Sequence, residues 1–167
     1  MLQDCLIFVR PLSCSNGHQH DLAFHTDSRA ISSMRQVSPE AATFPLYLHD
    51  GFDLARFSNY IANRTDFVVQ DYHSYFVFTP SDGAEPASQH TSDIESTVSD
   101  SLSNASSRQH RNLVVDEWSC ALTPQSMLNE ADQTTARKDF CTGQMKVYAN
   151  TTAGWSFWCM SLFRIRC

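Results

Sequence analysis

Short apolar runs alternate with amphipathic segments from about Phe44 to Trp158. The runs predict strands at residues 45–49, 67–78, 112–117 and 154–158. Between the strands, apolar residues recur at helical spacing and predict three helices. This alternation is typical of parallel strands joined by right-handed crossovers, in an α/β layer or an α/β barrel.

Each predicted helix has a start signal and an apolar stripe. Asp53 is the expected N-cap of the first helix, Ser92 and Glu95 have the form of a capping box for the second, and the third begins near Gln133. The expected buried stripes are Leu54, Phe57 and Ile61 in the first helix; Ile94, Val98, Leu102 and Ala105 in the second; and Cys141, Met145 and Tyr148 in the third.

The two ends of the chain lack this periodicity. We predict that residues 1–43 are an irregular lead-in and that residues 159–167 are a tail outside the domain, which spans residues 44–158. The lead-in contains His18, His20 and His25, but their spacing fits no established set of metal ligands. We therefore predict no metal site and no cofactor.

Composition excludes several classes of protein. The 167 residues are 42% apolar and 11% aromatic, as in globular proteins, and the formal charge of −6 argues against a nucleic-acid binder. No apolar run approaches the ~18–20 residues of a membrane span.

The six cysteines match no zinc pattern. Cys5 and Cys14 lie near one end of the chain; Cys120, Cys141, Cys159 and Cys167 allow three pairings among themselves, and the sequence does not choose among them. Asn-x-Ser/Thr sequons at Asn63, Asn104 and Asn150 are compatible with a secreted glycoprotein. Against secretion, residues 1–10 lack the long apolar segment of a signal peptide.

Polar and aromatic residues follow the predicted strands at their carboxyl ends: His49-Asp50, Asp71 to Tyr75, Asp116-Glu117 and Trp158. Ligands bind at this edge in parallel α/β folds. Strict alternation places Asp71, His73 and Tyr75 on one face, and it places Glu117 on the face of Leu113 and Val115. We expect Glu117 to meet His73, Tyr75 and Trp158, although each residue also has an ordinary structural interpretation as a strand cap, a structural histidine or a core aromatic.

Four motifs carry a resemblance to a known family: Leu48-His49-Asp50-Gly51-Phe52, Asp71 to Phe78, Val115-Asp116-Glu117-Trp118-Ser119 and Gly154 to Trp158. With these motifs the chain resembles the C-terminal half of family 5 glycoside hydrolases, close to the fungal exo-β-1,3-glucanases. The resemblance implies strands five to eight of a (β/α)8 barrel. It also implies retaining hydrolysis of β-glucan, by an extracellular enzyme of glucan catabolism or cell-wall remodelling.

The resemblance also implies roles for individual residues. Glu117 matches the catalytic nucleophile, and His73, Tyr75 and Trp158 match residues around the sugar that is cleaved. Phe78 and Phe52 match aromatics that contact the next sugar, and Asp50 belongs to the same substrate-binding set.

One part of the family's machinery has no counterpart in this sequence. The acid/base glutamate of the family lies in an Asn-Glu pair after strand four, whereas Asn129-Glu130 and Glu85-Pro86 belong to other segments. A nucleophile without its acid partner loses orders of magnitude in rate, so we expect this chain alone to be inactive or impaired. The alternatives are a non-catalytic glucan-binding remnant or a non-functional truncated product, and open barrel edges predict self-association. A serine hydrolase is disfavoured because no Gly-x-Ser-x-Gly elbow is present.

Overall fold

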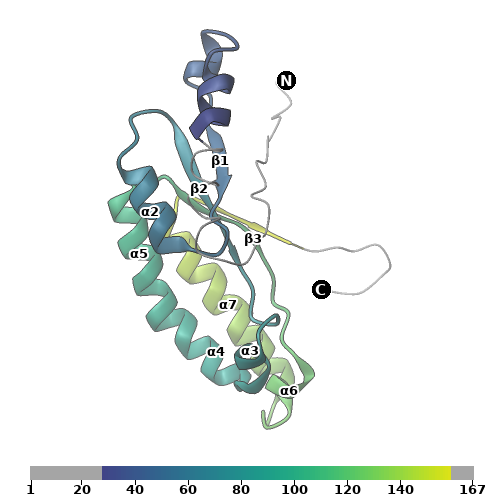
Figure 1. The fold of residues 1–167 in the computed structure, drawn as a ribbon. Coiled ribbons are helices and arrows are strands. Elements are labelled where there is room, and N and C mark those ends of the chain that lie inside the picture. Colours follow the sequence, from purple (N-terminus) through teal and green to yellow (C-terminus); the bar gives the residue numbers. More distant parts are fainter. Residues whose placement is uncertain (1–27, 159–167) are drawn as a thin grey trace, which may run out of the picture.

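Four parallel strands form a single sheet in the computed structural model, which describes residues 28–158 (Figure 1). The strands are β1 (Leu46–His49), β2 (Val68–Ser74), β3 (Leu113–Trp118) and β4 (Trp155–Phe157), and they lie side by side in the order of the sequence. The α/β class and the alternation of parallel strands with helices are thereby confirmed, and the arrangement is that of part of a (β/α)8 barrel.

The longer helices lie along one side of the sheet (Figure 1). The helical elements are η1 (Glu40–Ala42), α2 (Leu54–Ala62), α3 (Pro80–Ala84), α4 (Ala87–Asp93), η2 (Ile94–Val98), α5 (Ser99–Arg108), α6 (Pro124–Met127) and α7 (Gln133–Thr151). Asp53 is the N-cap of α2, as predicted, because its side chain accepts a hydrogen bond from the Arg56 amide.

The second predicted helix begins earlier than its capping-box signal indicates. Elements α4, η2 and α5 run on from one another from Ala87 to Arg108, so Ser92 lies inside a helix and the predicted start is wrong. Pro86, which favours a helix start, precedes Ala87. A reciprocal capping box exists instead at α3, between Thr79 and Asp82.

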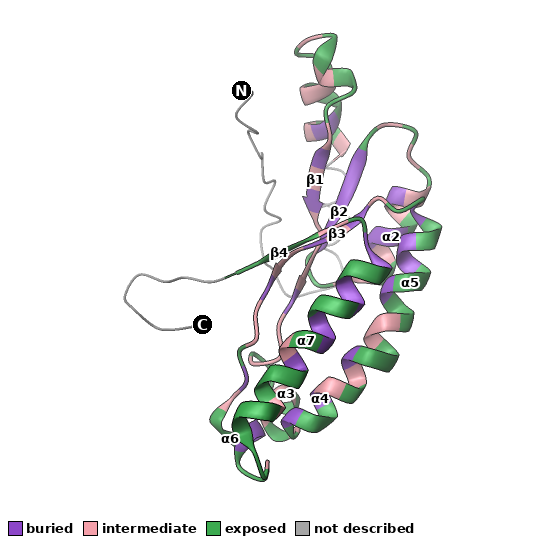
Figure 2. Cartoon of the chain, turned by 180° about the vertical axis from the view of Figure 1, so that it is seen from behind, coloured by how far each residue is buried: buried purple, intermediate pink, exposed green. Residues whose placement is uncertain are grey.

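The core lies between the sheet and the helices, and α5 and α7 each show one buried and one exposed side (Figure 2). One cluster joins Leu113, Val115 and Trp118 of β3 to residues of the α4–α5 and α7 helices. On α7 the predicted stripe is partly wrong, because Met145 is 43% exposed whereas Tyr148 is fully buried. The buried positions of α7 are Phe140, Gly143, Gln144, Val147, Tyr148 and Thr151.

Residues 28–35 are helical, which corrects the prediction of an irregular segment through residue 43. Ile31 in this helix is 3% exposed and packs in a second cluster with Leu46 and Leu48 of β1 and with Phe57 of α2. This burial stabilises a helix whose own sequence shows little periodicity. The predicted lead-in before residue 28 and the tail after residue 158 lie outside the described residues.

An open cavity of about 650 Å3 lies on the opposite side of the sheet, near the amino ends of the strands. It is lined by Phe44, Pro45, Tyr47, Phe67, Val69, Arg111, Asn112, Val114, Asp116, Ala153, Gly154 and Trp155.

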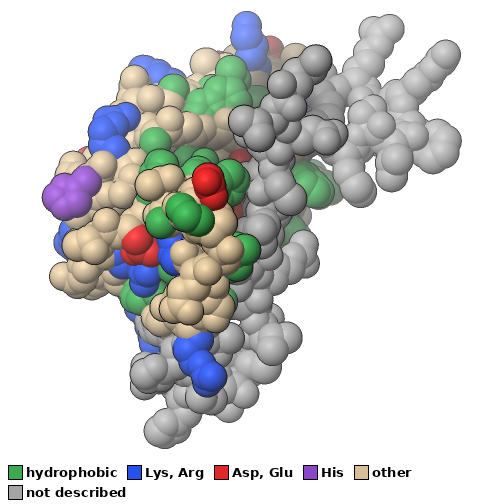
Figure 3. Space-filling view, turned by 90° about the horizontal axis from the view of Figure 1, so that it is seen from above, with side chains coloured by type: hydrophobic (Ala, Val, Ile, Leu, Met, Phe, Trp, Pro, Cys, Tyr) green, Lys and Arg blue, Asp and Glu red, His purple; other side chains and the backbone are tan. Residues whose placement is uncertain are grey.

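Seen from above the molecule, hydrophobic side chains reach the surface among Lys and Arg side chains (Figure 3). Within residues 28–158, no helix is both long enough and apolar enough for a membrane span.

Candidate functional site

Glu117 lies at the centre of a polar cluster at the carboxyl ends of β2 and β3. The Tyr75 hydroxyl donates a 2.7 Å hydrogen bond to Oε1 of Glu117, and Nδ1 of His73 lies 3.7 Å from its Oε2. On the other side of the imidazole, Nε2 of His73 lies 3.2 Å from Oδ2 of Asp71. The structure thus brings together Glu117, His73 and Tyr75, as the strand ends predict.

An irregularity in strand pairing gives Glu117 its position. Asp71 pairs with Val114 and His73 with Glu117, so β3 has one residue more than β2 over this interval. Such a bulge breaks the alternation of side chains. The predicted common face of Val115 and Glu117 is therefore wrong: Trp118 takes the next core position, and Glu117 is only partly buried.

The charges around His73 favour its protonated form. Burial by itself would lower the pKa of this imidazole, but the hydrogen bond and charge of Asp71, together with the charges of Glu117 and Asp50, raise it overall. The pKa of the Tyr75 hydroxyl is raised strongly by burial and by its hydrogen bond to Glu117. Tyr75 is therefore a donor, not an anion, at neutral pH, and it directs its proton at one oxygen of Glu117.

Asp50 directly follows β1 and belongs to a buried chain of hydrogen-bonded polar side chains. Its carboxylate accepts hydrogen bonds from Nε2 of Gln70 and from the Phe52 amide, and Oε1 of Gln70 accepts one from Gln109. Asp50 is fully buried, and desolvation raises its pKa to about 6. The predicted contact of Asp50 with substrate stays a prediction, and in this structure its carboxylate is enclosed by its hydrogen-bond partners. Asp50 supports the turn that carries Phe52.

Exposed aromatic rings flank the cluster on two sides. Phe52 is 68% exposed, and its ring centre lies 6.4 Å from that of His73; Phe78 is 75% exposed and lies 5.3 Å from the Tyr75 ring. The ring of His49 packs 4.2 Å from His73. The resemblance assigns no role to His49, although its position at the end of β1 places it at the edge where ligands bind in parallel α/β folds.

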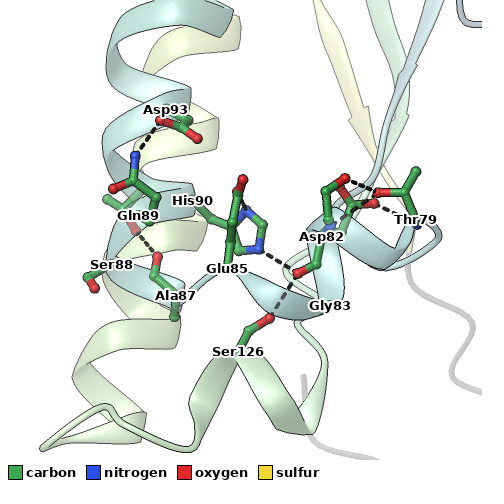
Figure 4. Close-up of polar contacts among 12 residues, drawn as sticks. Thr79, Asp82, Gly83, Glu85, Ala87, Ser88, Gln89, His90, Asp93 and Ser126 are labelled. Carbon is green, nitrogen blue, oxygen red and sulfur yellow. Dashed lines mark hydrogen bonds and ion pairs between the residues drawn. The ribbon is translucent and has the colours of Figure 1, made fainter.

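The loop that carries Phe78 is fixed by hydrogen bonds to α3, α4 and α6. The Asp82 side chain accepts hydrogen bonds from the amides of Phe78 and Thr79. Its carbonyl oxygen accepts one from Ser126 and lies 2.9 Å from Nε2 of buried His90 (Figure 4). Asp82 therefore links the Phe78 amide to α4 and α6, so the end of this loop is anchored although the Phe78 ring is exposed.

Trp158 is held through its backbone. Its amide donates a 2.8 Å hydrogen bond to the carbonyl oxygen of Trp118, and its side chain is 51% exposed. This places Trp158 beside the residue that follows Glu117. Its predicted contact with a sugar stays a prediction.

Two other carboxylates that the sequence offers as acids lie away from Glu117. Oε1 of Glu130 accepts a hydrogen bond from the Ser88 amide, and Glu85 lies 3.3 Å from the His90 ring. Asp116 is adjacent to Glu117, but it lines the cavity at the other side of β3, and burial and the charge of Asp71 raise its pKa. In the described part of the chain, no group of three His, Cys, Asp or Glu side chains is arranged to hold a metal ion.

Comparison with known proteins gives one point of reference. No family model matches the chain. The chain is 29% identical over 126 residues to glucan 1,3-beta-glucosidase 3 of Schizosaccharomyces pombe (strain 972 / ATCC 24843). The alignment covers 74% of this chain and 26% of that protein, so the chain spans about a quarter of the relative's length. It therefore has a distant similarity to a glycosidase.

Proposed function

We propose that this chain carries the nucleophile portion of a retaining β-glucan hydrolase site of the family 5 type, with Glu117 as the nucleophile. The observation that supports this most directly is the hydrogen bond from Tyr75 to Oε1 of Glu117 at the carboxyl ends of adjacent parallel strands. A donor on one oxygen orients the carboxylate and leaves the other oxygen for attack on an anomeric carbon. The similarity to a fungal glucosidase supports β-1,3-glucan or a related β-glucoside as the substrate class.

The substrate-binding surface in this proposal consists of His73, Tyr75 and three exposed aromatic residues, Phe52, Phe78 and Trp158. Pyranose rings present apolar C–H faces with polar rims, which suits stacking on an aromatic ring. Nε2 of His73 is engaged by Asp71, so His73 would donate to a sugar hydroxyl through Nδ1, which lies on the side of Glu117.

Hydrolysis by retention needs a second carboxyl group, roughly 5 Å from the nucleophile, that protonates the leaving oxygen. Neither Glu85 nor Glu130 lies in the Glu117 cluster, so we infer that this chain by itself is inactive or strongly impaired toward unactivated glucan. We also propose that the protein acts outside the cell, because the disulfide between Cys120 and Cys141 would persist in that oxidising environment.

The test uses a leaving group that needs no protonation. A 2,4-dinitrophenyl 2-deoxy-2-fluoro-β-glucoside should label Glu117 without any acid catalyst, because dinitrophenolate departs unassisted. Peptide mass mapping should find the fluoro-glucosyl group on Glu117, with no labelling of Glu117→Gln. Glu95→Gln, which removes an exposed carboxylate on η2, is the matched control and should be labelled like the native chain. Labelling on another residue, or none at all, would contradict the nucleophile assignment.

The second candidate is a glucan-binding module without chemistry, and the exposure of the three aromatic rings favours it. In that case laminarin should bind to the chain, Trp158→Ala should weaken the binding, and Glu117→Gln should leave it unchanged. The labelling experiment separates this candidate from the first.

A further inference from the structure

We propose that Tyr148, Gln144 and Cys141 of α7 are positioning residues that hold the carboxyl ends of β2 and β3 in register, and thereby set the contact between Tyr75 and Glu117. The inference rests on the proposed function for the importance of Glu117. The geometry that it describes is independent of any activity.

A chain of hydrogen bonds joins β2 through α7 to the segment after β3. The Tyr148 oxygen lies 2.8 Å from Oγ of Ser74 and 3.0 Å from Oε1 of Gln144, and Nε2 of Gln144 donates to the Ser119 carbonyl oxygen at 3.1 Å. A phenol has one proton. The Tyr148 hydroxyl is the donor in both contacts, so its single proton is shared between two acceptors, Oγ of Ser74 and Oε1 of Gln144.

The two ends of this chain lie beside the candidate site residues. Ser74 stands between His73 and Tyr75, and Ser119 follows Glu117 by two positions. Cys120, the next residue, is joined to Cys141 by a disulfide. Cys141, Gln144 and Tyr148 have the i, i+3, i+7 spacing of one helix face. One face of α7 therefore restrains both strand ends.

Packing alone does not require these polar groups. Tyr148 and Gln144 are fully buried and Ser74 is 2% exposed. Burying polar groups costs free energy unless every one of them is hydrogen-bonded. Burial raises the pKa of Tyr148, which keeps its hydroxyl neutral and able to donate. Apolar side chains would fill the same space. They would leave the two strand ends held by the strand pairing alone, without the contacts to α7, and small misplacements of reacting groups cost large factors in rate.

The test is Tyr148→Phe, which deletes one hydroxyl and keeps the ring. NMR titration should show the His73 pKa moving toward its ordinary value, because that pKa depends on the proximity of Asp71 and Glu117. Labelling of Glu117 by the dinitrophenyl fluoro-glucoside should slow about tenfold or more. Tyr60→Phe is the matched control: it removes a hydroxyl of α2 that contacts Arg64 and Ser28, and it should leave both readouts unchanged.

A second variant keeps the proposal testable where Tyr148→Phe does not fold. Ser74→Ala removes the strand-side hydroxyl alone and should change the His73 pKa in the same direction. If either variant lowers the melting temperature and leaves the His73 pKa and the labelling rate as in the native chain, α7 is only a packing element and the inference is wrong. If the native chain is not labelled, the proposed function fails, and the His73 titration still decides whether α7 positions the strand ends.

Discussion

Tyr75 and Glu117, 42 positions apart in the sequence, are joined by a 2.7 Å hydrogen bond from the phenol to Oε1 of the carboxylate. Tyr75 follows β2 and Glu117 lies near the end of β3, so the bond ties two neighbouring strand ends together. Burial and this bond raise the pKa of Tyr75, which keeps the phenol protonated at neutral pH. At neutral pH the Glu117 carboxylate therefore has a phenol donor on one oxygen.

Removing that donor should impair the reactivity of Glu117 more than the stability of the fold. A hydrogen bond to a charged group contributes about 1.5–3 kcal/mol, which corresponds to roughly a 10- to 100-fold change in rate. We expect Tyr75→Phe to slow labelling by the dinitrophenyl fluoro-glucoside by that factor. Tyr60→Phe, the same chemical change away from the site, should label at the native rate. A native labelling rate in Tyr75→Phe would show that the hydrogen bond does not orient the nucleophile.

Buried Asp50 should make the stability of the chain depend on pH. Its pKa is raised from 3.8 to about 6, so the folded chain binds a proton that the unfolded chain has already lost between those values. Stability from Asp50 is therefore full below about pH 4 and is lost as pH rises to about 6, by about 3 kcal/mol in total.

Asp50→Asn isolates this contribution. An amide at position 50 can donate to Oε1 of Gln70 once the Gln70 and Gln109 amides rotate, and Oε1 of Gln109 has no hydrogen-bond partner in the described part of the chain. The difference in melting temperature between Asp50→Asn and the native chain should grow in favour of the variant from pH 4 to pH 6.5. The raised pKa of His73 contributes in a separate window, because its stabilisation is lost only above about pH 6.5. A constant difference across pH 4 to 6.5 would mean that Asp50 is not protonated in the folded chain.

Local sequence signals were sufficient to predict an element whose structure depends on residues close together in the sequence. The Asp53 cap and the stripe of Phe57 and Ile61 describe α2 correctly because both depend on residues a few positions apart. The convergence of His73, Tyr75 and Glu117 was also predictable, because parallel strands bring their carboxyl ends to one edge.

Features that depend on pairing or on distant packing were not predictable from local pattern. The bulge that removes Glu117 from the face of Val115 arises only when β3 pairs with β2. Helix 28–35 is stabilised by the burial of Ile31 against β1 and α2. The enclosure of Asp50 results from Gln70 and Gln109, which belong to two other elements. In each case the deciding partner is far away in the sequence.

The exposed aromatic rings near Glu117 should carry most of the affinity for glucan. We expect Phe78→Ala and Trp158→Ala each to weaken binding of laminari-oligosaccharides, measured by calorimetry, about 2- to 13-fold, in line with roughly 0.5–1.5 kcal/mol for an aromatic contact. Phe67→Ala is the matched control, because this exposed ring lies before β2 and lines the cavity at the amino ends of the strands. An equal loss in Phe67→Ala would move the binding surface to that cavity and away from Glu117.

The outer edges of β1 and β4 should lead to self-association. Each of these strands pairs on one side only among the described residues, and an unpaired edge is a template for another strand. We expect light scattering after size exclusion to show dimers or larger species that increase with concentration. Leu46 and Asp50 donate their amides to β2, so the Tyr47 amide points to the outer edge. Tyr47→Pro removes that amide and should shift the equilibrium toward monomer, whereas Tyr47→Ala, which removes the side chain and keeps the amide, should associate like the native chain. A monomer at every concentration in the native chain would contradict association through these edges.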